Sequence, residues 1–305
     1  MKIAIIGCGA MGSVYAALLA DAGNEVWAID TWQEHIDAIN KNGLRVEGAS
    51  GDRTVKINAS ADAIDAGECD LIIVATKASG VATAAQAAKM IAGPNSVILT
   101  IQNGLGAADR IAEAIDTSQV MIGVVGGFGA SIKQPGHAHH NGMQLVRLGE
   151  MNGGMSDRLT TVVNTWEKAG FTANGYPDIH QMIWEKFICN VTYSGPCALM
   201  NATIGEVQAS SEAWFVALNC AKEADAVARA KNITLGFDDV ETYVREFGAN
   251  MPDARPSMLL DHLAKRPSEI DGINGAVPVE AKKIGMSAPI NELVSNLIRG
   301  KEANF

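Results

Sequence analysis

Six residues near the start of the chain have the spacing of a phosphate-binding loop. They are Gly7, Cys8, Gly9, Ala10, Met11 and Gly12, and they stand between a short apolar run and an Ala-rich stretch. In such a strand-loop-helix, Gly7 permits the tight turn, Gly9 lets the backbone approach a pyrophosphate, and Gly12 lets the helix pack closely on the strand. The first N–H groups of the helix then face the phosphates. The pattern predicts a dinucleotide site formed by these six residues.

An acidic residue follows this loop at the distance at which an adenine ribose is bound. Asp30 stands 18 residues after Gly12 and ends the second apolar run. A carboxylate at this place accepts hydrogen bonds from the ribose hydroxyls and repels a 2′-phosphate. Because residues 31–33 (Thr-Trp-Gln) supply no cation, we expect NAD to be preferred over NADP. The alternative is that Asp30 only caps the next helix.

A lysine and two polar residues share one face of a helix expected over residues 179–200. Lys186, Asn190 and Ser194 are spaced by four residues, which places them one turn apart. Reduction of a ketone requires a proton donor beside the carbonyl oxygen, and a cationic lysine can polarise that oxygen and release a proton. Lys186 is therefore the candidate general acid, with Asn190 and Ser194 as candidate substrate-binding groups. A solvated lysine on an amphipathic helix is the alternative.

Two kinds of predicted structure must position these residues. Up to about residue 175, short runs rich in Val and Ile alternate with helical patterns, which is typical of a mostly parallel sheet. The expected strands are 2–7, 25–30, 70–75, 96–101 and 120–127, and the expected crossover helices include 11–22 and 78–91. Two hairpins are also expected, Leu44–Val46 with Thr54–Asn58 and His137–Asn141 with Gln144–Gly149, the second turning at Asn141-Gly142.

Beyond about residue 176 the apolar residues recur with a helical period. This period covers residues 179–200, 211–231, 240–247, 257–265 and 272–284. The turn-forming residues 174–177 (Asn-Gly-Tyr-Pro) mark the change. The expected fold class is an α/β Rossmann-type dinucleotide-binding domain, residues 1–176, followed by an all-helical C-terminal domain, residues 177–305.

Together with the glycine loop, four further segments resemble the ketopantoate reductase (2-dehydropantoate 2-reductase) family. They are Ala75–Lys77, Gln102–Gly106, Trp184–Asn190, and Ser257–Asp261 followed by Glu269–Gly275. The resemblance runs from Lys2 to about Leu293. It implies an NAD(P)-dependent oxidoreductase that transfers a hydride to C2 of a 2-oxo acid, either 2-dehydropantoate or a less polar relative.

The resemblance also assigns roles in the second domain. Lys186 matches the general acid of the family, and Glu269 matches an active-site carboxylate that orients the lysine or the substrate hydroxyl. Ser257 matches a residue that binds the substrate carboxylate. The alternatives are local: Glu269 as an acid in the first turn of a helix, and Ser257 as an N-cap, which is compatible with substrate binding.

Asn103 and Lys77 each follow the carboxyl end of an expected strand, where open α/β sheets bind ligands. The family places both near the nicotinamide and the substrate, although an Asn before Gly can simply form a turn. The chain also departs from the best-known members, which have Asn where Ser194, Ile204 and Ala254 stand. Fewer amide groups favour a substrate less polar than ketopantoate.

Composition narrows the remaining classes. With 24 Lys+Arg against 34 Asp+Glu the net charge is −10, which argues against nucleic acid or an anionic membrane as a partner. The five cysteines are scattered and the N-terminal apolar run is short, so we expect a cytoplasmic protein without a disulfide framework or a targeting segment. The expected partner is a small 2-oxo or 2-hydroxy acid, and a homodimer is compatible with the sequence. His137, His139 and His140 cluster, but no acid or Cys lies nearby in the sequence, so no metal is expected.

Two alternatives stay open. The β-hydroxyacid dehydrogenases share a glycine loop and a Lys with an Asn four residues later, but the Gly-rich segment that they carry before this Lys is replaced here by Gln181–Trp184. A non-catalytic NAD sensor would need no proton donor, so the presence of Lys186, Asn190 and Glu269 together disfavours it. Cys189 is interpreted as a small buried hydrophobic residue.

Overall fold

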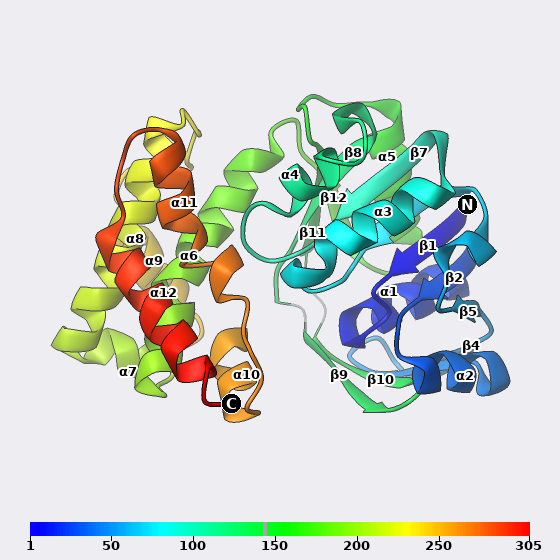
Figure 1. The fold of residues 1–305 in the computed structure, drawn as a ribbon, viewed down its shortest axis with the longest axis horizontal. Helices are drawn as coiled ribbons and strands as arrows, with labels where there is room; N and C mark the ends of the chain where they lie inside the picture. Colours follow the sequence, from blue (N-terminus) through cyan, green and yellow to red (C-terminus); the bar gives the residue numbers. More distant parts are fainter. Residues whose placement is uncertain (128, 143–144) are drawn as a thin grey trace. The chain divides into compact units, whose positions relative to one another are not determined.

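The computed structural model describes residues 1–127, 129–142 and 145–305. These residues form two compact units, one of residues 1–102 and 107–179 and one of residues 103–106 and 180–305 (Figure 1). The sequence-based division did not assign residues 103–106 to the helical part.

Most strands of the first unit form one large sheet. Its order in the described residues is β12-β11-β8-β7-β6-β1-β2-β5. The bounds are β1 (Lys2–Ile6), β2 (Glu25–Ile29), β5 (Asn58–Ser60), β6 (Cys69–Val74), β7 (Ala92–Thr100), β8 (Val120–Val125), β11 (Leu145–Glu150) and β12 (Thr172–Gly175). Neighbouring strands are parallel except β8 and β11, which are antiparallel. The predicted Rossmann-type class is confirmed.

Helices cover both faces of this sheet, as a parallel sheet requires. Ile3 and Ile5 of β1 pack in one apolar core with residues of α1 (Ala10–Asp21), α2 (Gln33–Asn42) and α5 (Asp157–Lys168). Ala4 and Ile6 alternate to the other face and pack with α3 (Val81–Ile91) and α4 (Ala107–Ala112). Three short 3₁₀ turns, η1 (Ala63–Ala66), η2 (Ala78–Gly80) and η3 (Thr117–Gln119), complete the connections.

A second, smaller sheet lies against the helix that opens at the glycine loop. Its order is β4-β3-β10-β9, from β3 (Leu44–Gly48), β4 (Arg53–Val55), β9 (Gly129–Gln134) and β10 (His137–Gly142). Helix α1 contacts these four strands as well as β1 and β2 (Figure 1). Residues 12–19 are consequently all buried, which explains why the helix is apolar on all sides.

The two predicted hairpins had different outcomes. Strands β3 and β4 pair antiparallel, so the first is confirmed, except that Asn58 belongs to β5 of the large sheet. The second is wrong: β10 pairs with β9 and β3, and β11 pairs with β8 and β12. Gln144 lies outside the described residues. The turn before β10, where Gly136 has φ +74°, joins β10 to β9, and the buried Val146 and Leu148 place β11 in the large sheet.

The second unit is helical over its described length, as predicted. It contains α6 (Ile179–Met200), α7 (Ile204–Ala209), α8 (Ser211–Ala230), α9 (Val240–Ala249), α10 (Ser257–Leu263), η4 (Ile270–Gly272), α11 (Ala276–Lys283) and α12 (Pro289–Glu302). Helices α7 and α12 were not predicted. A search of the described residues finds no helix with the length and apolar character needed to cross a membrane.

Candidate active site

The glycine loop has the geometry of a phosphate cradle. Gly7 has φ +93°, and a Cβ there would lie 2.6 Å from the backbone nitrogen of Thr76. A Cβ on Gly12 would lie 2.2 Å from the carbonyl oxygen of Gly7. Apart from Gly9 itself and its neighbours in the chain, no described heavy atom lies within 4 Å of a Cβ built on Gly9. Gly9 is also the N-cap residue of α1. The loop is therefore closely packed at its two ends and open in the middle, so its residues fit a bound dinucleotide.

A buried hydrogen-bond chain supports the loop from the protein side. The Ser13 hydroxyl donates to the Cys8 carbonyl at 3.2 Å and lies 3.1 Å from Nε2 of His35. The Gly136 N–H donates to Nδ1 of His35 at 3.0 Å. Because Nδ1 accepts, a neutral ring carries its proton on Nε2 and donates it to Ser13. Burial lowers the pKa of His35, and the charge of Asp30 opposes this effect.

These hydrogen bonds could not be predicted from the sequence, because Gly136 and His35 are 101 residues apart. Cys8 takes part through its carbonyl and through its thiol, whose Sγ lies 3.7 Å from Oγ of Ser13. Its side chain is fully buried, and burial raises the pKa of the thiol to about 12. Of the predicted cofactor residues, Cys8 can therefore contribute its backbone but not its thiol.

Asp30 lies directly after β2, at the carboxyl end of the strand. Its Oδ1 accepts a hydrogen bond from the Trp32 N–H at 3.0 Å, and Trp32, not Asp30, is the N-cap residue of α2. The alternative that Asp30 is the cap of this helix is therefore wrong. The side chain is half-buried and has a second carboxylate oxygen for hydrogen bonds to ribose hydroxyls.

The loop after β6 carries Lys77, whose side chain is exposed. This loop is fixed by Gln102, whose Nε2 donates to the carbonyls of Val74 at 2.7 Å and Thr76 at 3.0 Å. Thr76 in turn contacts Gly7. Sequence reasoning included Gln102 in a motif but gave it no role, and the structure shows that it connects the ends of two strands to the glycine loop.

In the second unit the structure brings Lys186 and Asn103 together. Nζ of Lys186 donates to Oδ1 of Asn103 at 2.8 Å, although the residues are 83 positions apart. Lys186 is half-buried on α6, and Asn190 one turn further is also half-buried. Ser194, one turn beyond, has only 3% exposure. The hydrogen bond to Asn103 therefore fixes the position of the Lys186 ammonium.

The loop that carries Asn103 packs on the turn that carries Glu269. The Leu105 N–H donates to the Gly272 carbonyl at 3.0 Å. Gly104 has φ +83°, and a Cβ there would lie 2.0 Å from that same carbonyl oxygen, so a glycine is required. Glu269 is the half-buried N-cap residue of η4, within the same turn.

The local alternatives for Glu269 and Ser257 can now be judged. Helix η4 has three residues, too few for a substantial helix dipole to favour an acid at its start. Ser257 is exposed and is the first residue of α10, whereas Pro256 occupies the N-cap position. The alternative that Ser257 is the N-cap is wrong.

Two of the three positions that depart from the family lie side by side. The Ile204 N–H donates to the Ala254 carbonyl at 3.1 Å. Ile204 is 4% exposed and packs in the helical core. Cys189 is likewise buried at 1% exposure, with its pKa raised to about 12 by burial, so the prediction that it is a buried hydrophobic residue is confirmed.

The histidine cluster has an acidic neighbour, contrary to our expectation. Glu47 of β3 lies opposite His139 in the parallel β3–β10 pair. Its carboxylate lies 3.2 Å from His137 Nε2 and 3.4 Å from His139 Nδ1. The acid was missed because it comes from a strand about 90 residues earlier. Across the described ranges, however, no group of three or more His, Cys, Asp or Glu has the arrangement of a metal site.

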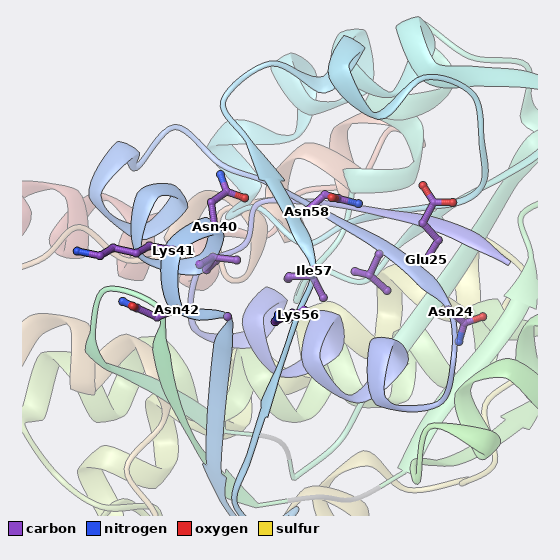
Figure 2. Close-up of a pocket in the computed structure, with 11 residues that line it drawn as sticks. Asn24, Glu25, Asn40, Lys41, Asn42, Lys56, Ile57 and Asn58 are labelled. Atoms are coloured by element: carbon purple, nitrogen blue, oxygen red, sulfur yellow. The ribbon is translucent and has the colours of Figure 1, made fainter.

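The first unit also contains a hollow, which Figure 2 shows with its lining residues. It is lined by Asn24, Glu25, Val26, Ile39, Asn40, Lys41, Asn42, Gly43, Lys56, Ile57 and Asn58. Glu25 and Asn58 are the first residues of β2 and β5, so the hollow is at the amino ends of these strands. Ligands of open α/β sheets bind at the carboxyl ends, and we assign this hollow no part in the site.

The first unit has a glycine loop at the end of a central parallel strand, and the helical unit has a lysine hydrogen-bonded to an asparagine. These features are those of an NAD(P)-dependent oxidoreductase. The family model described as Ketopantoate reductase PanE/ApbA matches residues 3–153, and that of its C-terminal part matches residues 178–302. The chain therefore belongs to the ketopantoate reductase family.

Individual relatives agree with this assignment. The 2-dehydropantoate 2-reductases of Streptococcus pyogenes and Pyrococcus horikoshii are 32% and 31% identical to this chain, over 99% of this chain and 98% of theirs. Among solved structures, a PanE/ApbA family ketopantoate reductase from Ralstonia eutropha matches with a TM-score of 0.90 at 29% identity. D-Mandelate dehydrogenase with NADH and anilino(oxo)acetate also matches with a TM-score of 0.90, at 28% identity. Both matches cover 100% of this chain and 99% of the other.

Proposed function

We propose that this chain reduces the C2 keto group of a 2-oxo acid with NADH, and that Lys186 donates the proton. The observation that carries the proposal is the hydrogen bond of 2.8 Å from Lys186 Nζ to Asn103 Oδ1. It orients an ammonium group beside the turn that carries the carboxylate of Glu269. The names of the relatives support the same substrate class, because dehydropantoate is a 2-oxo acid and mandelate is a 2-hydroxy acid.

The cofactor would be held by groups of known position. The N–H groups at the start of α1 would donate hydrogen bonds to the phosphates, and Asp30 would accept hydrogen bonds from the ribose hydroxyls. Lys77 and Asn103 are assigned to the nicotinamide end. When bound, NADH supplies the hydride. The carboxylate of Asp30, with no Lys or Arg at residues 31–33, favours NAD over NADP. The structurally similar D-mandelate dehydrogenase holds NADH, which supports this preference.

The remaining residues bind and orient the substrate. Lys186 polarises the keto oxygen and gives it a proton as the alkoxide develops. Asn190, one helical turn away, and Ser194 are assigned to hydrogen bonds with substrate oxygens, and Ser257 to the carboxylate. Glu269 orients the lysine or the substrate hydroxyl. The alternative of a β-hydroxyacid dehydrogenase is set aside, because the chain belongs to the ketopantoate reductase family.

We further propose that the enzyme reduces a 2-oxo acid less polar than ketopantoate at least as well as ketopantoate itself. Three positions that carry Asn in the best-known members are Ser194, Ile204 and Ala254 here. Each hydrogen bond that a buried polar group fails to make costs about 1–3 kcal/mol. The burial of Ile204 in the core means that it removes an amide rather than adding an apolar wall. The alternative is that other side chains supply the missing amides, and nearby Asn201 is one candidate.

The test is NADH oxidation with 2-oxo acids of graded size and polarity, including ketopantoate. We expect turnover with several of them and at least equal kcat/KM for an apolar 2-oxo acid. If ketopantoate exceeds every apolar substrate by more than tenfold, the substrate proposal is wrong. If NADH binds tightly but no 2-oxo acid is reduced, the chain is a sensor rather than a reductase. We place the enzyme in the cytoplasm because its five cysteines are all unpaired thiols, which cell fractionation can check.

A further inference from the structure

The last turn of α12 holds the segment that directly precedes Glu269. Oε1 of Glu302 accepts three hydrogen bonds, from the Ser268 N–H at 2.9 Å, the Ser268 hydroxyl at 2.5 Å and His262 Nε2 at 3.0 Å. The Glu302 side chain is 12% exposed and that of His262 is 3% exposed. Three donors on one nearly buried carboxylate oxygen make a rigid attachment.

This carboxylate joins two candidate site segments to α12. His262 belongs to α10, which begins at Ser257, and Ser268 is the residue before Glu269. Figure 1 shows the end of α12 beside α10 within this unit. A second contact comes from Arg299, one turn earlier, which donates to Asp271 Oδ1 at 2.9 and 2.7 Å. The second pair is exposed and is worth less than the buried one.

The attachment extends to the catalytic lysine through the turn. Glu269 begins η4, and the Gly272 carbonyl at its end accepts the Leu105 N–H. Asn103, two residues before Leu105, accepts the hydrogen bond from Lys186. A continuous series of contacts therefore leads from Glu302 through residues 268–272 and 103–105 to Lys186.

We infer that Glu302 is a positioning residue for this reaction: it fixes the backbone that presents Glu269 and, through the same turn, the Asn103 loop. The inference rests on the proposed function for its kinetic consequence but not for its structural one. Glu302 is connected to Lys186 through this series of contacts, and it takes no part in proton transfer.

The first experiment needs no turnover. Amide hydrogen exchange is compared between the full chain and its Glu302→Ala variant, with Glu292→Gln as the control, since Glu292 is an exposed acid on the same helix. We expect exchange at residues 268–275 and at Leu105 to rise at least fivefold in Glu302→Ala and to stay unchanged in the control. Unchanged exchange at Leu105 in Glu302→Ala overturns the inference, whatever the enzyme's substrate.

The second experiment measures kcat and KM with the best 2-oxo acid, well below the melting temperature of each variant. We expect Glu302→Ala to lower kcat at least tenfold while the Kd for NADH changes less than twofold. Glu302→Gln, which keeps an oxygen acceptor for Ser268, should recover part of the loss. In a Glu269→Gln background, Glu302→Ala should lower kcat by a smaller factor than in the wild type, because only its effect through the Asn103 loop remains.

A lower melting temperature with unchanged kcat and KM would show a merely structural role and overturn the inference. So would a loss of kcat in the Glu269→Gln background equal to that in the wild type, because Glu302 would then not act through Glu269. If the wild-type chain reduces no 2-oxo acid, the proposed function fails, and the exchange experiment alone decides whether Glu302 fixes the Asn103 loop.

Discussion

Replacing Asn103 by Ala removes the amide oxygen that accepts a hydrogen bond of 2.8 Å from the Lys186 ammonium. A hydrogen bond to a charged group is worth about 1.5–3 kcal/mol. At about 1.36 kcal/mol for each factor of ten in rate, loss of this orientation lowers kcat by about 10- to 150-fold. The half-burial of Lys186 favours the lower end of that range, because water can replace part of the lost bond.

The assay is a double-mutant cycle in the reduction of a 2-oxo acid by NADH. If Asn103 acts through Lys186, Asn103→Ala costs much less in a Lys186→Ala background than in the wild type. Asn103→Asp, which keeps an oxygen acceptor, should lose less activity than Asn103→Ala. Equal losses in both backgrounds would refute the reasoning. An increase in the Kd for NADH in both backgrounds would instead show that Asn103 mainly binds the cofactor.

Three further predictions concern the lysine, the cofactor and pH. Lys186→Ala should lower kcat by about 10²–10⁴-fold with little change in the Kd for NADH. Lys186→Arg should not restore kcat, because a guanidinium keeps its proton near neutral pH. Activity of Lys186→Ala within tenfold of the wild type would contradict the role of Lys186 as general acid. Asp30→Ala should narrow the ratio of kcat/KM with NADH to that with NADPH, and a wild-type preference for NADPH would be inconsistent with the role of Asp30. Burial lowers the pKa of His35, so below the ordinary histidine value of about 6.5 the unfolded chain binds a proton that the folded chain excludes, and the melting temperature should fall as pH decreases. His35→Gln should reduce this slope without abolishing it, since burial also lowers the pKa of His140; equal slopes would argue against a buried neutral His35.

The local sequence pattern was sufficient to predict those elements whose residues are adjacent in the chain. The glycine loop and the strands on either side of it could be predicted because turn, apolar run and helix are adjacent in the chain. Helix α6 could be predicted with the bounds Ile179–Met200 that it has in the structure, because its apolar period is long. The helical face of Lys186 and Asn190 followed from that period.

Features that depend on distant partners could not be predicted. The Asn141-Gly142 pair is a strong hairpin signal, but the pairing of β10 was decided by β3 and β9. Glu47 lies beside His137 and His139 because β3 pairs with β10. Likewise, α12 carries no motif, and the role we give to Glu302 depends on Ser268, 34 residues away. Side-chain contacts of this kind leave no periodicity in the sequence.

The assignment of residues 103–106 to the helical unit affects how this protein can be divided. The chain passes from one unit to the other after residues 102, 106 and 179. A gene fragment that encodes residues 180–305 alone lacks the loop whose Leu105 N–H binds Gly272 and whose Asn103 binds Lys186. A fragment that encodes residues 1–179 keeps this loop but not the turn on which it packs. Exchange of the helical unit between relatives therefore requires that residues 103–106 be exchanged with it. In a chimera with a single junction near residue 179, residues 103–106 would come from one protein and the turn that contains Gly272 from the other.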